Sequence, residues 1–568
     1  GYFCATNNPA LAEARLALEK ENAPRLLAQV TSDDTVNTQV TENGNTAEIT
    51  GGETRGDNLF HSFQDFSVKT GNEAFFNNAE SISNIFSRVT GGNVSDIDGA
   101  IRANGSASLF LINPAGILFG ADASLSIGGS FYGSTADSIL FEDGEFSAVN
   151  NLNQPILTIN APIGLVFRDN PEDIVINGDV SSSAFIEVTE AQKNLNLIGG
   201  NLDLNNVALV SFGGNVTLGG LQVSGIVKID KNGNLNFPEN LARGDISLDN
   251  TGVGVEDGSI NLNGNNIEML GRSYLESELQ SNFDFAEETP AGNINLNATE
   301  TIDMKEESSI SAGVNPGGTN NAGNIEINAA VLSINRSARI NTSTFGEGDA
   351  GNITLNVREN INLDQTAVFG GTGIFSIVES GAKGNGGNVE ITTTNLSLIN
   401  GADINANTFG EGDGGTISIN ASESITLDST TLDGQSISGI FSAVSQEAKG
   451  NSGNIEITTT NLSLTNGAEI DASTFGQGNA GEVNITATGD LTFDGETSEG
   501  FGSGATSQVA PDAVGNAGGI TISTNNLTLT NGGKVDASTF GQGNAGAVYI
   551  TATGVLTFDG ETSEGFGS

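Results

Sequence analysis

Apolar and polar residues alternate in short runs through the carboxyl-terminal half of the chain. In one stretch Ile455 and Ile457 are followed by Leu462 and Leu464 and then by Ile470, with polar residues between them. A period of two places successive side chains on opposite faces of a β-strand, so we expect half-buried strands of about three to five residues. Asn-Gly, Gly-Asn and Asp-Gly pairs between the runs predict tight turns.

This alternation is organised in long internal repeats. The stretch GNVEITTTNLSLINGADINANTFGEGDGG, which starts at Gly387, returns as GNIEITTTNLSLTNGAEIDASTFGQGNAG from Gly453. A Thr-Phe-Gly signature marks each copy, and its phenylalanines are Phe345, Phe409, Phe475 and Phe540, in steps of 64, 66 and 65 residues. A fixed period of this kind is the mark of a repeat architecture.

A solenoid accommodates these repeats better than a propeller. A propeller blade places four strands in about 40–45 residues, with hairpin turns between them. The unit of about 65 residues divides into three coils of about 21 or 22, which predicts an all-β chain folded as a three-sided parallel β-helix. Inward Ile, Leu and Val would stack along the axis. The Thr-Phe-Gly phenylalanines are expected inside or at a corner, with a carbohydrate-binding aromatic ladder as the alternative.

The charge of the chain argues against two classes of partner, and its single cysteine argues against an internal disulfide. The 568 residues carry a net charge of -49, with 69 acids against 20 bases. Nucleic acid is therefore not an expected partner, because binding phosphates needs clustered Lys and Arg. Direct docking on anionic lipid is disfavoured for the same reason. The single cysteine, Cys4, cannot form an internal disulfide, and no apolar run is long enough for a membrane-spanning helix.

One segment is conspicuously apolar in this polar chain. ANGSASLFLINPAGILFGADASLSIGGS, residues 103–130, carries Pro114 and Gly116 at its centre. Ordered motifs surround it, among them Asn-Leu-Phe-His-Ser-Phe at 58–63, Phe-Phe-Asn-Asn at 75–78 and Asn-Ile-Phe-Ser-Arg-Val-Thr-Gly-Gly at 84–92.

This series resembles the N-terminal secretion domain of filamentous haemagglutinins and related adhesins of two-partner secretion systems, in the form found in cyanobacterial members. The resemblance covers residues 31–260. It implies a right-handed parallel β-helix with some extra-helical strands in the amino-terminal part. It also implies export through the periplasm by a dedicated outer-membrane β-barrel transporter with periplasmic recognition domains, with folding outside the cell. A chain without disulfide-closed loops suits such threading.

The resemblance places transporter recognition at Asn113, Pro114, Ala115, Gly116 and Ile117. The family pattern is Asn-Pro-Asn-Gly-Ile, and Ala115 stands where the second asparagine would make a local turn hydrogen bond. We expect the turn to rest on Pro114 and Gly116. The apolar residues around it would add to a strand or groove of the transporter while unfolded, and would face inward once folded.

A β-helical enzyme is the main competing interpretation. Such sites need paired carboxylates or a Ca²⁺ ion beside a basic residue. The acids here are scattered through turn positions, and the only histidine, His61, lies in the Asn-Leu-Phe-His motif. Tyr132 and Arg102 have no clustered acids near them in sequence. We therefore predict no catalytic residue and no cofactor.

Calcium binding is the second chemistry considered. Gly-Glu-Gly-Asp motifs at Asp349 and Asp413 become Gly-Gln-Gly-Asn in later copies, with Asn479 and Asn544 at the same position. This exchange removes charge where Ca²⁺ would need it. Turn formation is the expected role, and no metal site is predicted.

Three segments follow from these patterns. Residues 1–30 are predicted as a leader or truncated export signal, 31–260 as the secretion domain, and 261–568 as a repetitive solenoid stalk. The motif FDGETSEGFGS at 493–503 recurs at 558–568, so we expect the stalk to continue further. The predicted function is a secreted or surface-exposed filamentous adhesin, with host-cell or matrix glycans as possible ligands. The alternatives are a polysaccharide-active enzyme or carbohydrate binder, and a structural sheath or surface-layer component.

Overall fold

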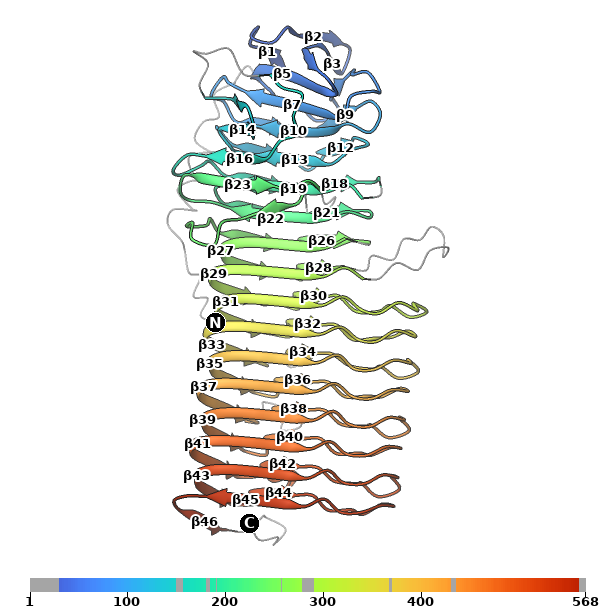
Figure 1. Cartoon of the computed structure of the whole chain (residues 1–568), viewed down its shortest axis with the longest axis vertical. Coiled ribbons are helices and arrows are strands. Elements are labelled where there is room, and N and C mark those ends of the chain that lie inside the picture. Colours follow the sequence, from blue (N-terminus) through green and yellow to red (C-terminus); the bar gives the residue numbers. More distant parts are fainter. Residues whose placement is uncertain are drawn as a thin grey trace.

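The chain forms a long rod of stacked β-strands (Figure 1). The structure is a computed structural model that describes residues 30–149, 157–179, 184–190, 192–256, 258–277, 291–366, 370–430 and 436–560. All the named secondary-structure elements in these ranges are β-strands. The described residues contain no helix long and apolar enough to cross a membrane. The predicted leader lies outside the described residues, apart from Val30.

In the stalk, each coil consists of one long strand followed by one short strand. The long strands are β27 (Ile260–Leu270), β29 (Ile294–Met304), β31 (Ile325–Asn335), β33 (Ile353–Asp364), β35 (Val389–Ile399), β37 (Ile417–Asp428), β39 (Ile455–Thr465), β41 (Val483–Asp494) and β43 (Ile520–Thr530). The short strands are β28 (Tyr274–Glu276), β30 (Ser309–Ser311), β32 (Arg339–Asn341), β34 (Gly373–Phe375), β36 (Asp403–Asn405), β38 (Gly439–Phe441), β40 (Glu469–Asp471), β42 (Gly504–Thr506) and β44 (Lys534–Asp536). Beyond them, β45 (Val548–Ala552) and β46 (Leu556–Asp559) pair with the two halves of β43.

Each long strand covers two sides of the rod, and each short strand covers the third. The first half of β27 pairs with β22 (Val216–Gly220), and its second half pairs with β25 (Ile246–Asp249), which is a separate strand. The pairing register shifts in the middle of the long strands, for example between Ala421 and Ser424. The strand bends at this shift. The predicted three-sided parallel β-helix is confirmed.

The predicted coil length is wrong. Each repeat contains two coils rather than three: hydrogen bonds link residues 28 positions apart at one coil, as from Asn352 to Asn324, and 36 apart at the next, as from Asn388 to Asn352. In the later repeats the longer of the two spacings is 38 and then 37 residues. Part of the extra length lies in loops that leave the three-sided helix after each short strand and return before the next long one (Figure 1). The longer coils also have a longer connection between the long and the short strand, as at 365–372 compared with 336–338.

We call these loops the wing. It comprises residues 312–324, 342–352, 376–388, 406–416, 442–454, 472–482, 507–519 and 537–547. Successive wing loops are bridged in parallel, as Thr344 is to Val378 and Val378 to Thr408. Asn385 donates its backbone N–H to Asp349 Oδ1 at 2.7 Å and accepts, at its own Oδ1, the N–H of Asp413 at 3.1 Å. The recurring Asn and Asp of the repeats therefore form a ladder along the axis.

The part of the chain predicted as the secretion domain has the same three sides, built from shorter strands. One side consists of β5 (Asn58–Asp65), β7 (Asn84–Val89), β10 (Ser108–Ile112), β13 (Phe131–Ser134), β19 (Leu195–Gly199) and β22. A second consists of β8 (Ser95–Ile97), β11 (Ile117–Phe119), β17 (Ile174–Asn177), β20 (Leu202–Asn205) and β25. The third contains β3 (Thr46–Gly51), β6 (Glu73–Phe76), β9 (Ala100–Ala103) and β12 (Ser124–Ser126), then β18 (Ala184–Val188), β21 (Val207–Ser211) and β26 (Gly252–Val255).

Antiparallel strands outside the helix cover its amino-terminal part, as expected. The end is closed by β1 (Thr31–Ser32), β2 (Thr38–Asn43) and β4 (Glu53–Arg55). A separate sheet contains β14 (Ser138–Phe141), β15 (Gly144–Ser147), β16 (Gly164–Phe167), β23 (Gly225–Ile229) and β24 (Leu235–Asn236). This sheet packs over a column of outward rings, Phe60, Phe86, Phe110 and Tyr132, and creates a second core beside the main one.

Close stacking of glycines in the wing gives a first prediction. A Cβ added at Gly453 would lie 2.1 Å from the carbonyl oxygen of Gly415 in the previous coil, whereas one at Gly519 would meet nothing nearer than 3.4 Å. Gly453→Ala is expected to destabilise the neighbouring coils by about 1–3 kcal/mol, since backbone cannot move aside cheaply. Limited proteolysis and thermal melting should show this loss. Gly519→Ala is the matched control, and equal behaviour of the two variants would contradict the packing.

Candidate functional site

The five predicted recognition residues lie where one side of the helix turns into the next. Asn113 directly follows β10, and Ile117 begins β11. Leu109 and Leu111 of β10 point into the main core together with Ile117. The structure thus brings the segment together as a corner of one coil, as the Asn-Pro-Ala-Gly pattern predicted.

The side chain of Asn113 holds this corner through three hydrogen bonds. Its Nδ2 donates to the carbonyl of Asn93 and to Ser95 Oγ, both at 2.9 Å, and its Oδ1 accepts the backbone N–H of Ala115 at 3.0 Å. The residue is 0 % exposed. The local turn bond expected from a second asparagine is therefore made by Asn113 itself, so Ala115 costs the folded turn nothing.

Pro114 and Gly116 complete the turn. The carbonyl of Pro114 accepts a hydrogen bond from Arg168 Nη2 at 2.6 Å, and Arg168 is also paired with Asp137 at 3.2 Å. Gly116 has a φ of 107° and donates its N–H to the carbonyl of Asn113 at 3.0 Å. Such a φ is strained for any residue with a side chain, which explains the glycine.

The folded segment offers almost no surface to a partner. Asn113, Pro114, Gly116 and Ile117 are buried, and Ala115 is half-buried. Ile117 lies between Ser95 and Ile174 of the adjacent coils, and its backbone is already paired in the sheet. A protein that binds these residues must therefore meet them before the chain has folded.

A buried arginine that the sequence analysis missed ties the amino-terminal cap to the coils. Arg88 is 1 % exposed, donates from Nε to Ser62 Oγ at 2.8 Å and lies 4.7 Å from the centre of the Phe146 ring. Burial works against ionisation of nearby Asp33, but hydrogen bonds from Ser62, Thr35 and Thr90 outweigh it and lower the pKa of that carboxyl. The only sequence signal was the Arg in the Asn-Ile-Phe-Ser-Arg-Val motif.

The three residues considered for catalysis are occupied by structural contacts. Burial lowers the pKa of His61 to about 4, and the ring is 1 % exposed with Thr38 Oγ1 3.2 Å from its Nδ1. Tyr132 donates to the carbonyl of Gly233 at 2.9 Å, and burial raises its pKa to about 12.

Arg102 has an acid partner that does not lie near it in sequence. Its Nε donates to Glu73 Oε1 at 2.5 Å, and its guanidinium lies 3.4 Å from the centre of the Phe75 ring. Glu73 lies on the preceding coil, 29 residues earlier, which explains why the sequence did not show it.

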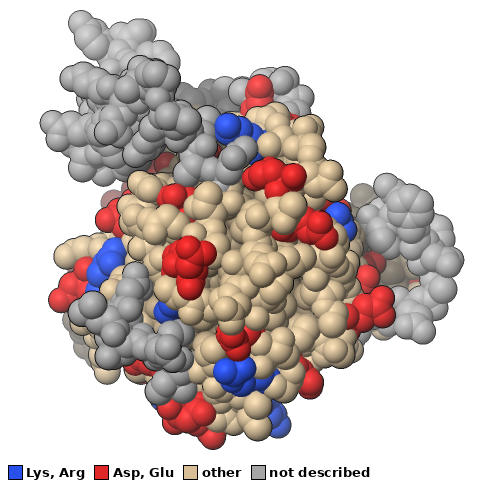
Figure 2. Space-filling view, turned by 90° about the horizontal axis from the view of Figure 1, so that it is seen from above, with Lys and Arg blue, Asp and Glu red and all other residues tan. Residues whose placement is uncertain are grey.

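The acids considered for calcium belong to the wing ladder. Asp349 Oδ1 accepts from the backbone and side-chain nitrogens of Asn385, and Asp413 Oδ1 accepts in the same way from Asn451. Within the described ranges, no group of three or more His, Cys, Asp or Glu is placed to hold a metal ion. Figure 2 looks down on the amino-terminal end and shows acids spread around it, with fewer Lys and Arg between them.

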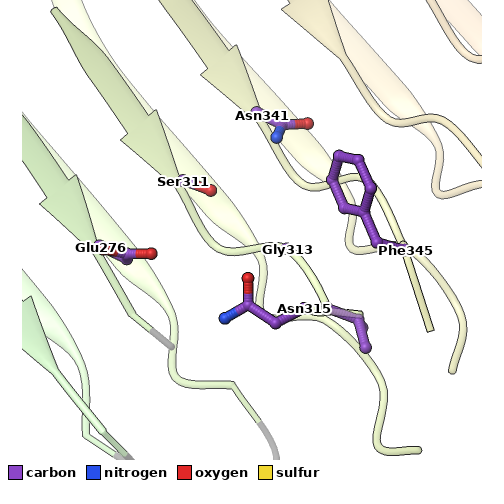
Figure 3. Close-up of a pocket in the computed structure, with 7 residues that line it drawn as sticks. Glu276, Ser311, Gly313, Asn315, Asn341 and Phe345 are labelled. Carbon is purple, nitrogen blue, oxygen red and sulfur yellow. The ribbon is translucent and has the colours of Figure 1, made fainter. Parts of the chain in front are cut away.

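The Thr-Phe-Gly phenylalanines are on the surface, so the prediction that they lie inside or at a corner is wrong. Phe345, Phe409, Phe475 and Phe540 are 44, 39, 42 and 62 % exposed. They follow the bridged residues of the wing, and their rings therefore point away from the core. Figure 3 shows Phe345 beside Asn315 and Asn341, at the edge of an open hollow.

Comparison with known proteins identifies the amino-terminal part. Residues 28–269 match the family described as the TPS secretion domain. The solved structure of the HMW1 secretion domain from Haemophilus influenzae is 14 % identical, with a TM-score of 0.32, covering 92 % of this chain and 99 % of that one. No curated protein matches the chain.

Residues 28–269 are thus a two-partner secretion domain. The chain is a secreted or surface-exposed, adhesin-like exoprotein whose export partner is a two-partner outer-membrane transporter.

Burial of His61 predicts a specific acid sensitivity. The folded pKa of about 4 lies below the ordinary 6.5, so between these values only the unfolded chain takes up the proton. The contribution of neutral His61 to the free energy of unfolding is complete above pH 6.5. It falls by about 3 kcal/mol as the pH drops to about 4. Urea-unfolding midpoints, followed by circular dichroism across this interval, should fall more steeply for the wild type than for His61→Leu. Parallel curves would contradict the assignment.

Proposed function

We propose that residues 113–117 form the element by which the transporter's periplasmic domains select this chain, and that they do so before it folds. The observation that carries the proposal is the burial of the segment: Asn113 is 0 % exposed, and its three hydrogen bonds are internal. The same residues are accessible only in an extended chain, which is the form that a β-barrel transporter can thread.

The apolar residues beside the turn are suited to strand addition. Leu109 and Leu111 on one side and Ile117 and Phe119 on the other alternate with their neighbours as strand residues do. An extended peptide of this kind adds to an open sheet edge through its backbone, while its alternate side chains fill pockets.

The stacking of the coils supports stepwise folding outside the cell. Within the coils of the secretion domain, strands pair in parallel with strands of neighbouring coils, as β10 does with β7 and β13. A coil that has formed presents an unpaired edge to the next, so structure propagates from neighbour to neighbour. The capped amino-terminal end supplies the first edge.

In this proposal the chain has a secretion domain at 31–260 and a stalk at 261–568. The change from separate short strands to long bent ones at Ile260 supports the boundary. Residues 1–30 would be the leader.

The exported rod acts by binding rather than by catalysis, with cell-surface or matrix glycans as its ligands. The structural contacts of His61, Tyr132 and Arg102 support a role without chemistry. An adhesin needs a long, rigid surface held away from the cell, and the stacked coils provide one.

The decisive test is secretion of full-length variants co-expressed with the transporter. Asn113→Ala and Pro114→Ala are expected to reduce the amount of protein in the medium at least tenfold. Asn113→Ala also destabilises the folded domain by about 1–3 kcal/mol, because buried groups lose their partners. A control of equal structural cost is therefore needed.

Asn58→Ala supplies that control. Asn58 is also buried and also makes three side-chain hydrogen bonds, to the carbonyls of Thr158 and Asn160 and from Asn84 Nδ2. If recognition resides in 113–117, Asn58→Ala is secreted much better than Asn113→Ala. Equal secretion of the two variants would reduce the segment to a folding role and overturn the proposal.

A further inference from the structure

The stalk carries a strip of surface that runs along the rod between its third side and the wing. At its upper end, Glu276, Ser311 and Asn341 come from the successive strands β28, β30 and β32, and their polar ends point toward Asn315 and Phe345 of the wing (Figure 3). The hollow between them is small and open to solvent. Because the coils repeat, the same two columns of residues continue down the stalk. We call this strip the axial groove, after the hollow at its upper end.

Aromatic rings line the wing side of the axial groove at a constant interval. Phe345, Phe409 and Phe475 occupy the same position in every second coil, where each backbone N–H bonds to the coil before it. Parallel strands are about 4.8 Å apart, so the rings repeat every ~9.6 Å along the rod. A regular column of exposed, large apolar side chains differs from the singly scattered ones that are normal on protein surfaces.

The floor of the groove carries rings in the intervening coils. Phe375 and Phe441 are the third residues of β34 and β38, and both are half-buried. A Cβ on Gly439 would come within 2.1 Å of the Phe441 ring, and one on Gly373 within 2.8 Å of the Phe375 ring. The tip of each ring therefore lies over a glycine of its own strand. The Arg339 guanidinium lies over the Phe375 ring, 5.7 Å from its centre.

Carboxylates and amides separate the floor rings. Asp403 is in register with Gly373 and Gly439, so its carboxylate lies between the two rings, where Asn405 Nδ2 donates to it at 3.4 Å. Burial raises the pKa of this carboxyl to about 7. In the next such coil Asp471 accepts from Thr506 Oγ1 at 2.8 Å. Apolar rings alternate here with hydrogen-bonding groups.

The geometry excludes a peptide strand as the occupant. The backbone of the floor strands is already paired above and below, so no sheet edge is open for strand addition. The groove also runs across the strands, along the rod, and therefore fits an extended linear polymer. The net charge of -49 repels polyanions such as sulfated or uronic glycans.

We propose that the axial groove binds a neutral, β-linked linear polysaccharide laid along the rod. The C–H faces of its sugar rings stack on the phenylalanines two coils apart, a spacing close to one extended disaccharide, and its hydroxyls bond to the Asp and Asn between them. This inference rests on the proposed adhesive function and gives it a site and a ligand class.

Binding of the full-length protein to cellulose and to cellohexaose tests the proposal, with heparin as the polyanionic probe. Phe409→Ala/Phe475→Ala removes two wing rings that lie outside the core, and is expected to weaken cellohexaose binding roughly tenfold or more. The matched control is Phe185→Ala/Phe501→Ala, which removes two exposed rings outside the groove, 46 and 55 % exposed. Circular dichroism should show both variants folded.

The remaining outcomes distinguish a failure of the axial groove as a binding site from a failure of the proposed adhesive function. Binding by the wild type that survives in Phe409→Ala/Phe475→Ala overturns the axial groove but leaves glycan adhesion standing. Preference for heparin over cellulose overturns the neutral ligand class. A wild type that binds none of the three probes overturns the groove as a site for this ligand class, and secretion assays on Asn113→Ala still test the export proposal independently.

Discussion

The structure depends on the hydrogen bonding of each coil to the next along the axis of the rod. Every strand from β27 to β43 pairs in parallel with the coils on both sides, and the same hydrophobic positions stack in one continuous core. In such an array stability comes from contacts between neighbouring coils, because each coil touches only the coils next to it. The wing extends this principle beyond the three-sided helix, because its Asn and Asp side chains bond to the backbone of the next loop.

This mode of assembly allows the proposed recognition segment to serve both export and folding. The apolar stretch around Asn113 is costly to expose in water, yet a secretion domain must expose it while the chain is unfolded. Once β10 and β11 pair with their neighbours, the same residues supply core side chains and a corner with no unpaired group on Asn113. Burial on folding therefore removes the proposed recognition segment from further contact.

The alternation of short and long coils gives the stalk its surface. Because two coils make one repeat, a residue that recurs once in 65 positions occupies every second coil. The rings of the wing are spaced accordingly, and the floor rings fill the coils between them. Acidic residues on this surface keep like rods apart, since net charge of one sign opposes association.

Alternation and repetition in the sequence were enough to establish the class of fold. Ile455, Ile457, Leu462 and Leu464 are all buried, as their period of two predicted, and the Asn-Pro-Ala-Gly turn stands where its residues placed it. Turn residues and strand periodicity act locally, which is why they can be recognised in one chain.

The coil length, the outward direction of Phe409 and the bonds of Asn113 were decided only by the tertiary structure. Each depends on partners 18 to 38 residues away, such as Ser95 for Asn113 and the preceding wing loop for Phe409. A period of two shows that side chains alternate, but near a glycine turn it does not show which of them face the core. That choice is made by the register between neighbouring coils, which exists only once the coils have stacked.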